Sequence, residues 1–164
     1  MMFIDKAGRP FEIRDYELPD YEPLLDMYAR FSPKGRFQGM PPEDFSACRN
    51  WVATLVQRGE TLLAWQDGEV IGHGVLLPDF EKGDAEYLIF VDQARRGRGV
   101  GTALTRVALW KAESLRLEKI WLTVEAFNFR ATKLYRKCGF GFCEAGGCQS
   151  ERTMTYICGC SHGP

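Results

Sequence analysis

A glycine-rich segment, residues 92–102, separates a predicted buried strand from a predicted amphipathic helix. Ala85–Val91 has little polar interruption and indicates a central strand, whereas Thr102–Leu117 has apolar residues at helical spacing. Glycine permits positive φ and lets an anion approach main-chain N–H groups, and the first turn of a helix adds unpaired N–H donors. The segment combines glycines with cations: Arg95, Arg96, Gly97, Arg98, Gly99 and Gly101. It therefore predicts a cradle for a phosphate or pyrophosphate.

Three kinds of phosphate-binding loop compete for this segment. A nucleoside-triphosphate loop ends in Gly-Lys-Ser/Thr, but this one ends in Gly101-Thr102 without a lysine. The dinucleotide fingerprint Gly-x-Gly-x-x-Gly fails because Leu104 stands where the third glycine belongs, and the fingerprint should open a domain. The third pattern, Gln/Arg-x-x-Gly-x-Gly/Ala, is met by Arg96 to Gly101.

The remaining elements place this loop in an α/β fold. Alternation and helical spacing predict strands at Phe11–Arg14, Thr61–Gln66, Glu69–Leu77, Ile120–Val124, Phe140–Glu144 and Arg152–Cys158, and helices at Asp20–Phe31, from Pro42 to Gly59 and at Asn128–Cys138. The resulting order is β-α-α-β-β-β-α-β-α-β-β. A strand–helix–strand unit in the second half requires a parallel pair, so we expect a mixed central β-sheet with helices on both faces.

Length and charge limit the class of protein. A chain of 164 residues predicts a single domain over residues 1–164, with its core at about 11–158. A net charge of −1 excludes the basic footprint of a non-specific nucleic-acid binder, so no nucleic-acid partner is expected. No apolar run approaches a membrane span, and Asp5 stands where a signal peptide would be apolar. We therefore expect a cytoplasmic protein without a membrane partner.

The cysteines and histidines do not predict a metal site. The C-terminal group Cys143, Cys148, Cys158, Cys160 and His162 lacks Cys-x₂₋₄-Cys pairing on both sides, so reduced thiols are expected and no metal. We expect His73, a lone strand histidine, to be structural.

A second segment, Val124–Phe140, carries a polar pair at helical spacing. Asn128 and Tyr135 are seven residues apart, which brings them within about 20° of one line and about 10 Å along a helix axis. Ala131 lies between them and permits close approach of a long, thin ligand such as a pantetheine arm. The alternative is an amphipathic helix in which Tyr135 is only a core residue.

With both segments in order, the sequence resembles the GNAT superfamily of N-acetyltransferases over residues 11–158. Its second segment is similar to the family's strand, Asn-x-x-Ala-x-x-Leu-Tyr helix and following Gly-Phe. The resemblance implies acetyl-CoA as co-substrate, with its pyrophosphate on the loop and its pantetheine amides on the edge of the preceding strand. The coenzyme-binding residues that it implies are Ile89, Val91, Arg96, Gly97, Arg98, Gly99, Val100, Gly101, Thr102, Asn128 and Ala131.

The resemblance also implies catalytic roles. Tyr135 would donate a proton to the departing thiolate. Many family members carry a carboxylate an even number of residues before the position of Val91, but Glu86 lies at an odd position. Alternation sends Glu86 to the opposite face unless a bulge intervenes. Glu86 is a candidate general base, and Glu125, Tyr87 and a water chain are its alternatives.

We therefore expect an acetyl-CoA-dependent N-acetyltransferase in which a primary amine attacks directly in a ternary complex. A longer acyl-CoA, or a coenzyme-binding regulatory module without catalysis, is the alternative. The acceptor is a small-molecule amine or the amine of a peptide or protein, and a homodimer is compatible with the family. The cations of Arg30–Gln38 either favour an acidic acceptor or belong to a solvated loop.

Overall fold

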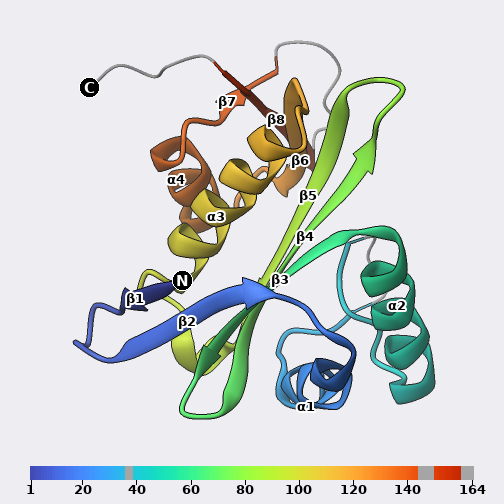
Figure 1. The fold of residues 1–164 in the computed structure, drawn as a ribbon, viewed down its shortest axis with the longest axis vertical. Helices are drawn as coiled ribbons and strands as arrows, with labels where there is room; N and C mark the ends of the chain where they lie inside the picture. The colour runs from blue at the N-terminus through green and yellow to red at the C-terminus, as the bar shows by residue number, and fades with distance from the viewer. Residues whose placement is uncertain (36–38, 144–149, 160–164) are drawn as a thin grey trace.

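The computed structural model of the protein describes residues 1–35, 39–143 and 150–159. One eight-stranded mixed sheet has the strand order β1-β2-β3-β4-β5-β6-β8-β7 (Figure 1). The strands are β1 (Met2–Ile4), β2 (Pro10–Asp15), β3 (Glu60–Gln66), β4 (Glu69–Asp79), β5 (Asp84–Val91), β6 (Lys119–Glu125), β7 (Gly141–Phe142) and β8 (Glu151–Ile157). The helices are α1 (Tyr21–Arg30), α2 (Phe45–Arg58), α3 (Val100–Ser114) and α4 (Phe129–Lys137).

This architecture confirms the predicted α/β fold, with an additional strand and a shifted helix. The short strand β1 precedes the predicted first strand and pairs antiparallel with it, Phe3 opposite Phe11. The α3 helix begins at Val100, two residues earlier than expected, and ends at Ser114. Every strand pair is antiparallel except β5–β6, which is the predicted parallel pair.

Helices cover both faces of the sheet (Figure 1). Successive side chains of a strand point to opposite faces, and the apolar side chains on each face pack into a separate core. On β5, Tyr87 and Ile89 pack into the core that α3 and α4 share with the sheet, whereas Leu88 and Phe90 pack into the core under α1 and α2. No helix in the part of the chain that the structure describes is long and apolar enough to span a bilayer.

The β5–β6 pair opens part-way along its length. Asp84–Glu86 pairs with Lys119–Trp121, and the β5 register with β6 stops there, while β6 continues beside β8 to Glu125. From Tyr87 to Val91, β5 is therefore bonded to β4 on one side and, within the described residues, has no strand partner on the other. This unpaired edge leads directly into the glycine-rich loop.

Candidate active site

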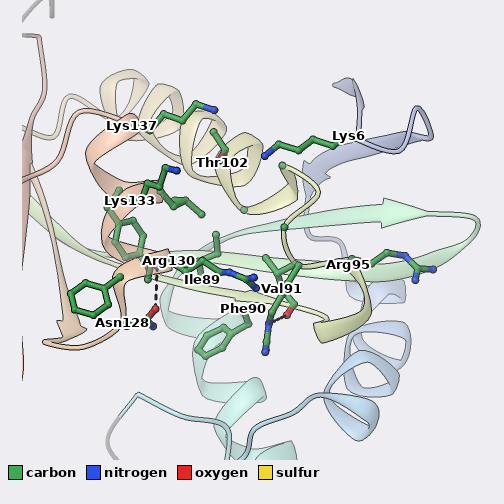
Figure 2. A pocket seen from close by; sticks show the side chains of 18 of the residues that line it. Lys6, Ile89, Phe90, Val91, Arg95, Thr102, Asn128, Arg130, Lys133 and Lys137 are labelled. Atoms are coloured by element: carbon green, nitrogen blue, oxygen red, sulfur yellow. Dashed lines mark hydrogen bonds between the residues drawn. The ribbon is translucent and has the colours of Figure 1, made fainter.

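A cavity of about 780 Å³ lies along this open edge, between the glycine-rich loop and α4 (Figure 2). It collects most of the residues that the sequence singles out, although they are spread over some 45 positions of the chain. The predicted residues that line it are Ile89, Val91, Arg96, Gly97, Gly99, Gly101, Thr102, Asn128, Ala131 and Tyr135. Strand, loop and helix thus converge on one cavity.

The loop has the backbone that its glycines suggest. Gly97 and Gly99 have φ of +75° and +94°, in the left-handed region that side chains avoid. Gly99 is also the N-cap of α3 and supplies no side chain, so the first N–H groups of the helix are left for a ligand. Gly101 has a different role: a Cβ there would lie 2.9 Å from Cδ1 of Leu134, so glycine lets α3 approach α4 closely.

The two polar ends of α4 differ in their availability. Asn128 is the N-cap, and its side-chain oxygen accepts the Ala131 N–H at 3.1 Å, while its amide NH₂ can donate to a ligand. Tyr135, at the other end, is 9% exposed and packs on Phe140 with ring centroids 5.8 Å apart. Burial raises the pKa of Tyr135 to about 12. Tyr135 is thus a core residue that also lines the cavity, so it combines the two interpretations, a core position and a ligand-facing position.

Glu86 does not line the cavity. It lies on the opposite face of β5 from Tyr87, as alternation predicts, because the β4–β5 register runs without a shift from Asp79–Asp84 to Gly72–Val91. Glu86 is half-buried, and burial raises its pKa. The structure does not bring Glu86 together with the cavity residues. Its role as general base therefore stays a prediction.

Two predicted coenzyme residues also lie outside the cavity lining. The Val100 side chain is 1% exposed and packs in the core beneath α3. Arg98 contributes its carbonyl oxygen, which accepts the Lys6 N–H at 2.9 Å and so joins the β1–β2 turn to the loop. Val100 faces the sheet, where its Cγ1 would lie 3.4 Å from a Cβ built on Gly72, and the Arg98 backbone anchors the turn.

Several lining residues were not predicted. They are Lys6, Phe31, Pro33, Phe90, Phe129, Arg130, Lys133, Leu134 and Lys137, whereas Arg95, which also lines the cavity, belongs to the predicted cradle. Three of the four cations of α4, Arg130, Lys133 and Lys137, could have been found, because spacings of three and four residues put them on one helix face. Lys6 and Phe31 carry no local signal, since long-range packing brings them to the cavity.

The remaining sequence features are structural or lie elsewhere. His73 is fully buried, and its Nδ1 lies 2.7 Å from the Tyr28 hydroxyl. Burial lowers the pKa of His73 to about 3, so the ring is neutral. Arg30 donates to Asp92 at 2.7 Å and to the Val70 carbonyl at 2.6 Å, so its charge is not offered to an acceptor.

Some of the predictions fall on residues that the structure does not describe. Arg36–Gln38 at the end of the cationic segment, and Cys148, Cys160 and His162, lie outside the described residues. Within the described ranges, no group of three or more His, Cys, Asp or Glu residues could hold a metal ion, and the thiols of Cys48, Cys138, Cys143 and Cys158 are free.

Comparison with known proteins decides the family. The acetyltransferase (GNAT) family matches residues 21–140, which include the whole cavity apart from Lys6. The chain belongs to the GNAT acetyltransferase family. As a GNAT member it is an acetyl-CoA-dependent N-acetyltransferase, and acetyl-CoA is the co-substrate of the family.

Two curated relatives and one solved structure are similar to this GNAT protein. L-amino acid N-acetyltransferase AaaT of Escherichia coli (strain K12) is 31% identical over 154 residues, covering 88% of this chain and 91% of that protein. L-methionine sulfoximine/L-methionine sulfone acetyltransferase of Pseudomonas aeruginosa is 29% identical over 60% of this chain, and the match spans only 61% of that protein. The GNAT domain of S. lividans PAT has the same fold, with a TM-score of 0.79 at 17% identity, covering 96% of both chains.

Proposed function

We propose that the protein transfers the acetyl group of acetyl-CoA to a primary amine by direct attack in a ternary complex. The observation that carries this proposal is the convergence of three features on one cavity: the unpaired edge of β5, the glycine-rich start of α3, and Tyr135. The names of the two curated relatives, which specify amino-acid acceptors, support a small amine rather than a protein as acceptor.

The cavity residues fit the parts of the coenzyme. Main-chain N–H groups from Gly97 to Thr102, at the positive end of the α3 dipole, would bind the pyrophosphate. The free edge at Ile89 and Val91 would pair with the pantetheine amides as an added strand does. The Asn128 NH₂ group is left to donate a further hydrogen bond, because only its oxygen is used in capping.

The chemistry requires a neutral amine and a stabilised leaving group. The amine lone pair attacks the thioester carbonyl, the tetrahedral intermediate collapses, and the C–S bond breaks to give the amide and the coenzyme thiolate. One proton leaves the nitrogen, and the departed thiolate then takes one up from solvent, which balances the reaction. We infer that water receives the first proton, with Glu86 as the alternative.

Tyr135 acts mainly as a hydrogen-bond donor to the sulfur. Its pKa of about 12 keeps the phenol protonated at neutral pH. An ordinary thiol has a pKa of about 8.5, so complete transfer of the phenolic proton to the thiolate is uphill by about 5 kcal/mol. A charge-assisted hydrogen bond from the phenol needs no such transfer and still stabilises the developing negative charge.

The experiment is an amine panel with acetyl-CoA, in which the acetylated product and free CoA are both quantified by mass spectrometry. Mass spectrometry is preferable to a thiol reagent because the protein itself has six cysteines. Direct attack predicts intersecting initial-velocity lines and no acetylated enzyme. Parallel lines would refute the ternary complex, faster turnover with propionyl-CoA would favour a longer acyl donor, and coenzyme binding without turnover of any amine would indicate a regulatory module.

A further inference from the structure

The charge around the cavity is unbalanced. Its lining includes six cationic side chains, Lys6, Arg95, Arg96, Arg130, Lys133 and Lys137, whereas none of the described lining residues is acidic. Lys6 and Lys137 lie near Thr102 at the start of α3, where the phosphates of the coenzyme would bind (Figure 2). Such a cavity repels a polyamine, since every further ammonium group of the acceptor would enter a field of like charge.

Arg96 turns away from the coenzyme end of the cavity. Its Nε donates to the Val91 carbonyl at 3.0 Å, and its Nη2 donates to the Ser32 carbonyl at 2.7 Å. The guanidinium also lies over the Phe31 ring, 5.1 Å from its centroid. Phe31 and Ser32 directly follow α1, so the Arg96 side chain lies on the side of the cavity that Phe31 and Pro33 line.

Arg130 approaches the same region from the opposite side. It follows the N-terminal residue of α4, and its side chain extends toward Val91 (Figure 2). Burial, and next the positive charge of Arg130, lower the pKa of Arg96, so the two guanidinium groups lie within electrostatic reach of each other. Neither forms an ion pair with a carboxylate within the described ranges.

The acid that does influence Arg96 is already engaged. Asp92 partly offsets the lowering of the Arg96 pKa, but its carboxylate accepts hydrogen bonds from Arg30 at 2.7 Å and from the Ala94 N–H at 2.9 Å. The two arginines thus repel each other, and the rings of Phe31 and Phe90, which also line the cavity, offer them no negative charge. A carboxylate placed between them would relieve the repulsion and form charge-assisted hydrogen bonds.

We propose that the amine acceptor carries a carboxylate, as an α-amino acid does, and that Arg96 and Arg130 bind this carboxylate. The apolar part of the acceptor packs on Phe31 and Phe90, which line the cavity beside Arg96. This inference rests on the proposed N-acetyltransferase function and names its substrate class.

The test compares acceptors that differ only in the carboxylate: L-methionine with 3-(methylthio)propylamine, L-leucine with 3-methylbutylamine, and L-phenylalanine with 2-phenylethylamine. Values of kcat/KM are expressed per neutral amine, because loss of the carboxylate raises the pKa of the amine. We expect at least one amino acid to exceed its decarboxylated partner by 10-fold or more. In Arg130→Gln this ratio falls on the order of 10- to 100-fold, as for the loss of hydrogen bonds to a charged group.

Arg136→Gln is the matched control, because Arg136 lies on the same helix but stacks on Phe142 and does not line the cavity. This control should keep the wild-type ratio. Equal or faster acetylation of the decarboxylated amines would refute the inference and leave the proposed function intact. A rise in the acetyl-CoA KM of Arg130→Gln with every acceptor, at an unchanged ratio, would assign Arg130 to the coenzyme phosphates and also refute the inference. No turnover of any amine would refute the proposed function itself.

Discussion

Replacing Tyr135 by phenylalanine tests the role of the phenol with little structural disturbance. The ring would keep its packing on Phe140, and the hydroxyl has no hydrogen-bond partner among the described residues, so folding stability should change little. A hydrogen bond to a charged group contributes about 1.5–3 kcal/mol. Because 1.36 kcal/mol corresponds to a tenfold rate, Tyr135→Phe should lower kcat by about 10- to 150-fold.

The assay measures kcat at saturating acetyl-CoA and amine, with coenzyme affinity measured separately by calorimetry. We expect the acetyl-CoA Kd to stay within about twofold of wild type, since the bond forms only as the thiolate departs. Tyr87→Phe is the control. The Tyr87 hydroxyl is buried 3.2 Å from Thr105 and outside the cavity lining, so its loss should lower stability by about 1 kcal/mol and spare kcat. A fall in kcat in Tyr87→Phe would instead support Tyr87 as the general base. An unchanged kcat in Tyr135→Phe would refute the leaving-group role.

Three further perturbations test the parts around the cavity. Asp92→Asn should lower the free energy of unfolding by about 1–3 kcal/mol at pH 7, because Arg30 loses its ion-pair partner. This loss is smaller than for a fully buried ion pair, because the Arg30 side chain is partly exposed. Burial raises the pKa of Asp92, but hydrogen bonds from Arg30 and the Ala94 N–H lower it overall. Urea titrations should therefore show the stability difference between wild type and Asp92→Asn shrinking as the pH falls below about 4, where the carboxylate becomes protonated. Gly99→Ala places a side chain at φ +94° and should cost about 1–2 kcal/mol of stability and weaken acetyl-CoA binding in calorimetry. Lys133→Gln combined with Lys137→Gln should raise the acetyl-CoA KM about 2- to 10-fold at low salt, and the effect should fade in 0.5 M salt if these exposed cations meet the coenzyme phosphates.

The sequence predicts those parts of the site whose geometry is local. Asn128 caps the helix that carries Tyr135, so their seven-residue spacing predicts one common side, and both residues line the cavity. The alternation of β5 likewise predicts that Glu86 points away from Tyr87, and the regular β4–β5 register confirms it. Such relations need only the periods of a helix and a strand.

Features that depend on long-range contacts could not be predicted in this way. Strand β1 has three residues, too few for a periodicity, and exists because β2 offers it an edge. The helix predicted at Asn128–Cys138 begins one residue later, at Phe129, and Asn128 is its N-cap, with φ −82° and ψ 74°, because its side chain accepts the Ala131 N–H. Here local chemistry rather than periodicity decides where the helix begins.

The two ends of the cavity form one hydrogen-bonded unit, which explains why no acceptor motif is apparent in the sequence. Gln93, at the start of the glycine-rich loop, donates to the Arg30 carbonyl at 2.6 Å and accepts the Ser32 N–H at 3.0 Å. Arg96 adds its bond to Ser32 and its contact with Phe31. The segment after α1 therefore takes its position from the coenzyme loop, some 60 residues away in the chain. We therefore propose that acceptor preference resides in contacts between these segments, and that Arg96 serves the coenzyme with its backbone and the acceptor with its side chain.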